Sequence, residues 1–257
     1  MLFRSRIAEV LGAHLTPGME IDVALHTHGI PVDWPEEVTG QAAGFSTTVR
    51  REDMVGRKDV RGIPLVTIDG ADARDFDDAV WCEPTDSGWR LVVAIADVAH
   101  YVAPGSPLDR EAVRRGTSVY FPGRVVPMLP EVLSNGLCSL NPEVDRLCML
   151  CDMSLDEHGK VRKARFHNGV MRSHARLTYS KVHEILTESG SALREEHAPL
   201  VPMIENLHRL YEVLAKVRRK RGAIEFDSNE TRIVFDGERK ISEIVPVTRN
   251  DAHKLIE

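Results

Sequence analysis

The sequence contains no long hydrophobic run. Its longest apolar stretch, from Leu91 to Ala96, stops at Asp97, whereas a membrane-spanning helix needs about 20 apolar residues. The N-terminus also has no apolar segment followed by the small-residue cleavage site of a secretory signal. These absences predict a cytoplasmic protein with no membrane partner. The chain has 42% hydrophobic and 28% charged residues, which is typical of a folded globular protein.

The sequence also has no excess of basic residues. Its formal net charge is −6 and its isoelectric point is about 6.0, whereas nucleic-acid-binding proteins usually present a basic surface. The overall charge is therefore an argument against a nucleic-acid partner. One strong basic cluster is present, at residues 218–221. It could contact phosphates, but it also suits the last turn of a helix, where cations are favourable to the helix dipole.

The cysteines are too few for a paired zinc motif. Cys148 and Cys151 form a C-x-x-C, but the other two cysteines, Cys82 and Cys138, stand alone. Because free cysteine is commonly buried, we expect the C-x-x-C to lie in an apolar strand over residues 147–155. No G-x-S-x-G, Walker or G-x-G-x-x-G motif is present, so we expect no organic cofactor.

The order of apolar segments predicts a mixed α/β fold of the α+β type. We expect a central mixed or antiparallel sheet with helices packed around it and an aspartate-rich loop at its edge. One helix should begin at Pro107, with Ser106 as N-cap and Gly116 after its end. The other helices are expected near residues 179–186 and 200–214, and the strands near residues 7–11, 19–26, 63–68, 79–83, 89–96, 148–155, 161–171, 232–235 and 241–247.

The ends of the chain predict an incomplete domain. Residues 36–62 are polar and rich in turn-forming residues, and we interpret them as a linker between a short N-terminal piece, residues 1–35, and a main domain, residues 63–257. Asp251 is expected to be the N-cap of a new helix, which has barely one turn before the sequence stops. A helix of that length is not stable alone, so we expect the chain to be a fragment cut within a domain.

The most informative segment has five aspartates in ten positions between two apolar strands: Asp69, Asp72, Asp75, Asp77 and Asp78. Carboxylates that are packed together repel one another unless some are protonated, and a divalent cation with oxygen ligands removes that conflict. The segment therefore predicts a Mg²⁺ site, in which Mn²⁺ could substitute. In an extended loop Asp75 and Asp77 would share a face, with Asp78 pointing the other way unless the loop turns there.

Three alternatives remain for the aspartate-rich segment. A solvated acidic turn is compatible with its composition. A calcium loop of the helix-loop-helix type requires glycine at position 6 and glutamate at position 12, and these positions hold Arg74 and Val80 when Asp69 is position 1. An aspartyl-phosphate phosphatase also places aspartates after a strand, but the sequence shows no accompanying nucleophile and lysine set.

The sequence around the aspartates resembles a known family. P-L-V-T-I-D-G at residues 64–70 and R-D-F-D-D-A-V at residues 74–80 are similar to the catalytic motif of the ribonuclease II/ribonuclease R (RNB) family, most of all its bacterial ribonuclease R branch. The similarity extends in order over nearly the whole chain from about residue 4, with further matching segments at residues 93–98, 116–122, 127–134, 137–142, 173–179 and 249–257. Such long collinear similarity is far more specific than a single short motif.

The resemblance implies an activity and a set of site residues. Members of this family are processive, Mg²⁺-dependent 3′→5′ exoribonucleases that release nucleoside 5′-monophosphates. The residues that match the family's metal and catalytic aspartates are Asp69, Asp75, Asp77 and Asp78. Tyr120 matches a tyrosine that stacks on the 3′-terminal base, and Phe226 corresponds to a phenylalanine on the other side of the bases. Arg176 and Tyr179 are expected to face the RNA, although Tyr179 could instead be the first core residue of its helix.

The resemblance also implies parts that the sequence lacks. Residues 1–35 resemble the remnant of a cold-shock-type β-barrel, and the family's nuclease domain continues beyond residue 257 with a catalytic arginine, followed by an OB-fold and often a basic tail. These parts would supply the missing positive charge. We expect a monomeric protein that binds the single-stranded 3′ end of RNA, with little or no activity in the isolated chain. The rival hypothesis is a catalytically silent RNA- or protein-binding piece, which would have little use for the four aspartates.

Overall fold

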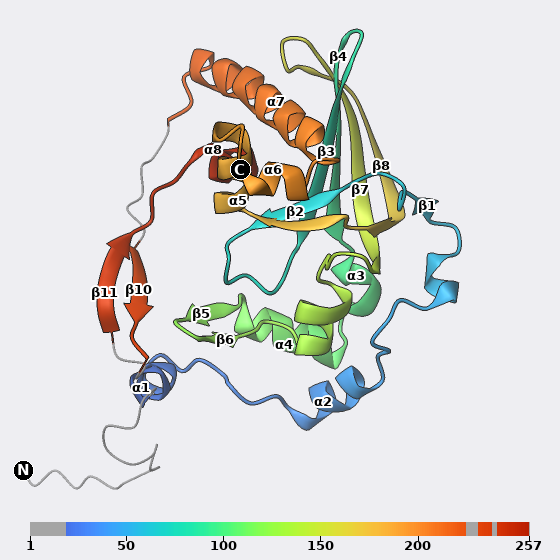
Figure 1. Ribbon diagram of the computed structural model, residues 1–257. Helices are drawn as coiled ribbons and strands as arrows, with labels where there is room; N and C mark the ends of the chain where they lie inside the picture. Colours follow the sequence, from blue (N-terminus) through green and yellow to red (C-terminus); the bar gives the residue numbers. More distant parts are fainter. Residues whose placement is uncertain (1–18, 225–230, 238–240, 257) are drawn as a thin grey trace, which may run out of the picture.

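The centre of the molecule is a seven-stranded mixed sheet (Figure 1). The structure is a computed structural model that describes residues 19–224, 231–237 and 241–256. The strands follow the order β1-β8-β7-β4-β3-β2-β9, with parallel pairs β1/β8 and β2/β9 and antiparallel pairs elsewhere. The expected mixed sheet is thereby confirmed. Its strands are β1 (Lys58–Asp59), β2 (Val66–Asp69), β3 (Asp78–Thr85), β4 (Gly88–Ala96), β7 (Asp145–Asp156), β8 (Val161–Arg172) and β9 (Ala175–Thr178).

Strands β3, β4, β7 and β8 form an antiparallel meander whose register fixes the position of the aspartates. Asp78 at the start of β3 lies opposite Ile95 of β4, and Ile95 lies opposite Met149 of β7. The turn between β3 and β4 depends on Gly88, which has φ = 141°. A Cβ atom there would lie 2.2 Å from the carbonyl oxygen of Leu155, so a side chain at this position would force the strands apart.

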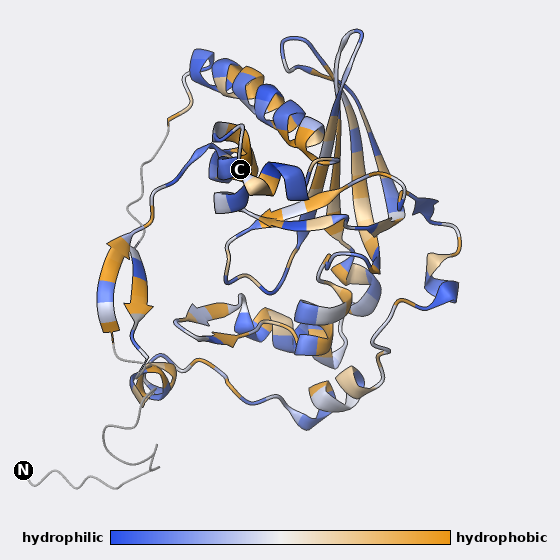
Figure 2. Ribbon diagram, viewed as in Figure 1, coloured by the Kyte–Doolittle hydropathy of each residue, from blue (hydrophilic) through white to orange (hydrophobic). Residues whose placement is uncertain are grey.

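Both faces of the sheet are covered, and each has its own apolar core. On one face, Val80 and Cys82 pack with the long helix α7 (Val201–Lys220) and with α5 (Tyr179–Thr187) and α8 (Asp251–Ile256). Figure 2 shows apolar and polar residues alternating along α7, as in an amphipathic helix. The other face packs Ala79 and Val92 against α3 (Val98–Tyr101), α4 (Pro107–Arg115) and a short π-helical segment, Val132–Leu137. None of the described helices is long and apolar enough to cross a membrane.

Several expected elements are confirmed. The helix α4 has Ser106 as its N-cap, whose hydroxyl accepts a hydrogen bond from the backbone N–H of Asp109, and Gly116 follows the helix with φ = 75°. Cys148 and Cys151 lie in β7, as free cysteines. Strands β10 (Thr231–Phe235) and β11 (Ile241–Pro246) pair antiparallel as a separate two-stranded sheet. Strands β5 (Val119–Phe121) and β6 (Arg124–Val126) form another, and the short helix α6 (Ala192–Glu196) follows α5.

The strand expected at residues 19–26 is wrong, because this segment forms the helix α1 (Met19–Thr27). Apolar residues alternate with polar ones from Met19 to Val23, which is typical of a strand, but a strand needs a partner and no described strand pairs here. The helix is favoured by acidic residues in its first turn and a histidine in its last, and only Leu25 is buried. The strand expected at residues 7–11 lies outside the described residues.

The structure adds detail to the expected linker and shifts one helix cap. The segment 36–62 carries the helix α2 (Glu36–Ala43), the 3-10 turn Arg51–Met54 and β1, and Val38 of α2 is fully buried. At the last helix, the side chain of Asn250 accepts a hydrogen bond from the backbone N–H of Ala252 at 3.0 Å, so Asn250 takes the N-cap position expected for Asp251. An asparagine at the preceding position provides the same side-chain oxygen acceptor as the aspartate.

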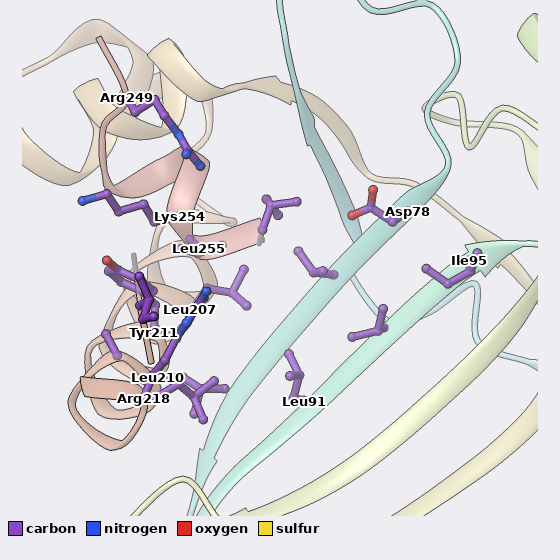
Figure 3. Close-up of a pocket in the computed structure, with 16 residues that line it drawn as sticks. Asp78, Leu91, Ile95, Leu207, Leu210, Tyr211, Arg218, Arg249, Lys254 and Leu255 are labelled. Atoms are coloured by element: carbon purple, nitrogen blue, oxygen red, sulfur yellow. The ribbon is translucent and has the colours of Figure 1, made fainter. Parts of the chain in front are cut away.

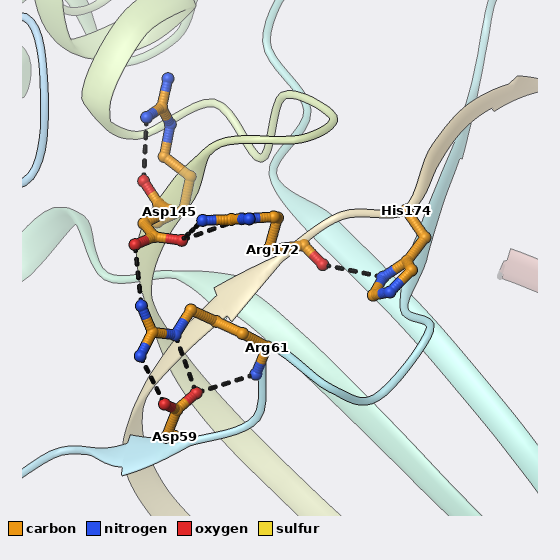
Figure 4. A network of polar contacts seen from close by, with 6 residues as sticks. Asp59, Arg61, Asp145, Arg172 and His174 are labelled. Atoms are coloured by element: carbon orange, nitrogen blue, oxygen red, sulfur yellow. Dashed lines mark hydrogen bonds and ion pairs between the residues drawn. The ribbon is translucent and has the colours of Figure 1, made fainter.

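A polar network fastens β1 to the rest of the sheet (Figure 4). Asp145 of β7 accepts hydrogen bonds from Arg61 at 3.0 Å and from Arg172 of β8 at 2.8 Å, and Arg61 also pairs with Asp59. Next to it, the His174 ring lies within hydrogen-bond distance of the Arg172 carbonyl oxygen. Because β1 pairs with β8 at only two residues, these side chains contribute much of what holds this edge.

Candidate active site

The structure brings the aspartate-rich segment to one end of the sheet. Asp69 is the last residue of β2, Asp78 is the first residue of β3, and residues 70–77 form the loop between them, called the aspartate loop below. Strands β2 and β3 pair antiparallel at Val66 and Val80. The last residue of β2, Asp69, and the first residue of β3, Asp78, therefore lie at the same end of the two strands. Asp75 and Asp77 extend from the loop itself. The strand pairing therefore brings the four aspartates to one end of the sheet, while their role as metal ligands stays a prediction.

The aspartates influence one another's ionisation. The pKa of Asp69 is raised to about 7, first by burial and then by the charges of Asp78 and Asp77. The pKa of Asp77 is raised to about 6 by desolvation and by the charges of Asp75 and Asp78, although its side chain is open to solvent. Burial also raises the pKa of Asp78. These carboxyl groups are thus close enough to repel.

The residues fit a divalent cation in their chemistry. Asp69 Oδ2 is buried without a hydrogen-bond partner among the described residues, and a buried unpartnered carboxylate oxygen is costly. Oxygen atoms of this kind are the ligands that Mg²⁺ prefers. As the side chains lie, however, no three acidic, histidine or cysteine residues in the described ranges converge closely enough to hold a metal ion. Within the same ranges, Cys148 and Cys151 of the C-x-x-C in β7 are not part of a group of three possible zinc ligands.

The backbone of the aspartate loop is held by an arginine that the sequence assigned to RNA. Arg176 of β9 donates hydrogen bonds to the carbonyl oxygens of Ala71 at 3.1 Å and Ala73 at 3.0 Å. Its guanidinium also lies 4.7 Å from the centre of the Phe76 ring, and its charge partly offsets the rise in the pKa of Asp69. Sequence reasoning missed these loop contacts, because they join residues more than a hundred positions apart. The RNA contact of Arg176 stays a prediction.

Tyr120 reaches the aspartate loop from the β5–β6 hairpin. Its hydroxyl donates a hydrogen bond to Asp75 Oδ2 at 2.5 Å, and burial together with this bond raises its pKa. The side chain is nevertheless 54% exposed, so its ring has a free surface. A small cavity of about 40 Å³ adjoins it, lined by Arg74, Asp75, Glu131 and others. Phe226, the expected partner of Tyr120, lies outside the described residues.

Tyr179 lies beside the aspartates and is also part of the core. It is the first residue of α5, behind the N-cap Thr178, and it packs against the core below α7. Its ring stacks on His253 with a centroid distance of 4.2 Å. Burial raises its pKa, as do the nearby charges of Asp69 and Asp78. The structure therefore agrees with the alternative that Tyr179 is the first core residue of its helix, while leaving it near the aspartates.

A larger cavity of about 690 Å³, lined at one point by Asp78, lies between the sheet and the helices α7 and α8. Figure 3 shows Asp78 and Ile95 on the strand side, with Arg218, Arg249 and Lys254 on the helix side. Arg218 belongs to the last turn of α7, together with Arg219 and Lys220, as the helix-dipole interpretation predicted. Sequence reasoning missed the cavity residues of α8, although the matching segment at residues 249–257 contained them.

Comparisons with known proteins identify the family of this chain. The family model described as "RNB domain" matches residues 57–257, and the model described as "Cold shock domain" matches residues 3–35. Ribonuclease R of Vibrio cholerae is 59% identical over 253 residues, which are 98% of this chain and 31% of that protein. The chain therefore spans about a third of the length of this relative.

Solved structures show the same fold. Ribonuclease R of Mycoplasma genitalium, in complex with ribose-methylated single-stranded RNA, superposes with a TM-score of 0.88 at 31% identity, over 96% of this chain and 38% of that one. Yeast Ssd1, described as a pseudonuclease, superposes with a TM-score of 0.69 at 15% identity, over 96% of this chain and 30% of that one. The latter likeness shows the fold alone. From the family match and the identity to its relatives, the chain belongs to the RNB domain family and is similar to bacterial ribonuclease R.

Proposed function

We propose that this chain supplies the metal-binding part of the nuclease centre of a processive 3′→5′ exoribonuclease that hydrolyses RNA to nucleoside 5′-monophosphates. The observation that carries the proposal is the gathering of Asp69, Asp75, Asp77 and Asp78 at one end of the sheet, with raised pKa values for three of them and a buried, unpartnered oxygen on Asp69. Such an arrangement is unfavourable without a cation. The family membership supports the same function.

The four aspartates would hold Mg²⁺, and Mn²⁺ serves as its experimental substitute. A bound ion would supply the positive charge that activates a water molecule and stabilises the charge that develops on the phosphate. The residues of the chain prepare this site. Arg176 fixes the backbone at Ala71 and Ala73. A bound ion would compete with the Tyr120 hydroxyl for Asp75 Oδ2.

The single-stranded 3′ end of RNA is the proposed partner. The half-exposed ring of Tyr120 can stack on a base, and stacking suits an enzyme that digests any sequence because every base has a π-face. Phe226 would lie on the other side of the bases, and Arg176 and Tyr179 are placed beside the aspartates. The proposal includes a monomeric, cytoplasmic protein, with residues 1–35 as part of a cold-shock-type barrel, residues 36–62 as a connection and residues 63–257 in the nuclease domain.

A catalytically silent RNA- or protein-binding role is the second candidate. Yeast Ssd1 shares the fold and is described as a pseudonuclease, so the fold alone does not decide between the two. The four carboxylates favour the nuclease, because a silent protein gains nothing from their repulsion. We propose little or no activity for the isolated chain, because it spans only about a third of its relative's length.

The experiment that tests the proposal compares two aspartates of the same loop. Mn²⁺ is titrated by calorimetry into the chain, its Asp77→Asn variant and its Asp72→Asn variant, since Asp72 is exposed and is not one of the four. The product of the complete gene is then assayed on 3′-tailed RNA with the same variants. We expect Asp77→Asn to abolish saturable binding and degradation while Asp72→Asn preserves both. Wild-type degradation by Asp77→Asn would refute the proposed role.

A further inference from the structure

The aspartate loop is held from the opposite side by a serine that no catalytic assignment includes. Ser139 is fully buried and follows the π-helical segment Val132–Leu137 by two positions. Its hydroxyl accepts a hydrogen bond from the backbone N–H of Phe76 at 3.0 Å and donates one to the carbonyl oxygen of Arg74 at 3.2 Å. The next backbone N–H, that of Leu140, donates to the carbonyl oxygen of Phe76 at 2.8 Å.

These three hydrogen bonds act on the two neighbours of Asp75. The carbonyl group before it and the amide and carbonyl groups after it are all tied to Ser139 and Leu140. The peptide units around Asp75 therefore cannot rotate independently. The bond to the carbonyl oxygen of Phe76 also fixes the peptide unit that leads to Asp77. Because side-chain direction follows from backbone dihedral angles, the contacts decide where both carboxyl groups point.

A buried arginine fixes the serine in turn. Arg146 is only 7% exposed, and its Nε donates to the carbonyl oxygen of Ser139 at 2.7 Å. Burial lowers the pKa of its guanidinium, and no carboxylate in the described ranges forms an ion pair with it. A buried charge without a counter-ion is costly, so an apolar residue would fill this space more favourably than Arg146. Its hydrogen bonds to Ser139 and to the carbonyl oxygen of Asp145 give it a function.

A purely structural serine in this protein looks different. Ser173 is equally buried, but its hydroxyl donates to the carbonyl oxygen of Ala175, two positions away. Ser173 precedes β9, whose first residue, Ala175, pairs with Val66 at the start of β2. Asp69 lies at the other end of β2. The Ser139 hydroxyl instead bridges 63 and 65 positions of sequence to reach the aspartate loop. The Ser173 hydroxyl therefore serves local packing, whereas the Ser139 hydroxyl holds the aspartate loop.

We infer that Ser139, oriented by Arg146, is a positioning residue that holds the aspartate loop in the conformation needed for phosphodiester hydrolysis. The inference rests on the proposed function for its catalytic consequence. Its structural part, the hold on the backbone at Phe76, can be measured without RNA. The Ser139 hydroxyl is buried and bonds the backbone of Arg74 and Phe76, so Ser139 acts through the loop.

The test uses Ser139→Ala, with Ser173→Ala as the matched control. In the 257-residue chain, hydrogen exchange of the Phe76 amide is followed by NMR, and we expect Ser139→Ala to accelerate it at least about tenfold more than Ser173→Ala. In the product of the complete gene, we expect kcat on 3′-tailed RNA to fall about 10- to 100-fold with little change in KM, because a displaced catalytic group slows chemistry rather than binding. Ser139→Cys retains a side chain of similar size that hydrogen-bonds more weakly. Its Phe76 exchange rate and its kcat should lie between those of the unsubstituted protein and those of Ser139→Ala. This variant keeps the test decisive if Ser139→Ala does not fold.

Two outcomes would overturn the inference. One is exchange of the Phe76 amide in Ser139→Ala and Ser139→Cys that matches the Ser173→Ala control. The other is normal kcat in both Ser139 variants when the unsubstituted enzyme degrades RNA. An unsubstituted gene product that does not degrade RNA would refute the proposed function instead, and the exchange measurement would still decide whether Ser139 holds the loop.

Discussion

The hydroxyl of Tyr120 donates a hydrogen bond to Asp75 Oδ2 at 2.5 Å, and this bond joins the β5–β6 hairpin to the aspartate loop. The candidate base-stacking residue and a candidate metal ligand are thus directly connected. A cation bound by Asp75 would compete with the hydroxyl for the same carboxylate. The bond therefore couples the two halves of the proposed site.

Removal of that hydroxyl should strengthen metal binding. Tyr120→Phe retains the ring but frees Asp75 Oδ2, and we expect Mn²⁺ to bind the chain about three- to tenfold more tightly, because the net contribution of a partly exposed hydrogen bond is roughly 1 kcal/mol. Calorimetry measures the change. Tyr101→Phe is the control, since the buried hydroxyl of Tyr101 has no partner among the described residues. Equal or weaker binding by Tyr120→Phe would show that the two groups do not compete.

The raised pKa of Asp69 makes stability depend on pH. In the folded chain this carboxyl keeps its proton up to a pKa of about 7, whereas the unfolded chain loses it near pH 4. The unfolded state then binds fewer protons between these values, so this group's contribution to the free energy of unfolding falls as pH rises from about 4 to 7. Asp77, with a pKa of about 6, should act in the same direction but less, because it is open to solvent.

Urea unfolding without divalent ions, followed across that pH range, checks this prediction. The side chain of Asp69→Asn cannot ionise, so the free energy of unfolding of this variant should rise relative to that of the wild-type chain as pH rises. Added Mg²⁺ should stabilise the wild-type chain and so narrow the difference in free energy of unfolding. Asp72→Asn is the charge-matched control in the same loop. Parallel pH profiles for the wild type and Asp69→Asn would contradict the assigned burial and repulsion.

Local sequence patterns predicted much of this fold and most of the aspartate cluster. The strands of the meander are separated by turn-forming residues at 84–88 and 156–159, and the Ser106, Pro107 and Gly116 signals of α4 lie within one short segment. Asp69 and Asp78 were predictable because each borders an apolar strand. In all these cases the determining interactions are close in sequence.

Other features depend on contacts that local patterns do not contain. The segment from Met19 to Val23 has the alternation of a strand, but it lies in a helix and pairs with none of the described strands. The loop contacts of Arg176 and Ser139 join residues 63 to 105 positions apart, and nothing in their immediate neighbours indicates them. A buried serine or an exposed arginine has many possible partners, and only the folded sheet selects one.

Arg176 should prove more important for the aspartate loop than for the core. Arg176→Ala removes two hydrogen bonds to loop carbonyl groups and the cation over Phe76. We expect Mn²⁺ affinity to fall about five- to tenfold, while the free energy of unfolding falls by only about 1 kcal/mol, because the side chain is exposed. Arg165→Ala, an exposed arginine of β8, should change neither quantity. Reduced RNA affinity with unchanged Mn²⁺ affinity would instead favour the RNA contact predicted from sequence.

Asp145 provides the opposite case, a residue that should matter for stability and not for metal. It accepts hydrogen bonds from both Arg61 and Arg172, so Asp145→Asn would leave two guanidinium groups without their shared carboxylate. We expect a loss of about 1 to 2 kcal/mol in the free energy of unfolding, measured with urea at neutral pH. Mn²⁺ affinity should stay within about twofold, because Asp145 is not among the four aspartates whose charges interact.

Glu37 supplies the control for Asp145. It pairs with Arg110 at 3.0 Å, but both side chains are more than half exposed, and exposed ion pairs contribute little because solvent screens them. Glu37→Gln should therefore cost less than about 0.5 kcal/mol. If the two variants lost equal stability, the Asp145 network would contribute no more than an ordinary surface ion pair. The short strand β1 would then be held by its backbone pairing with Gly169 and Val170, by the Lys58–Asp152 ion pair and by the buried side chain of Val60.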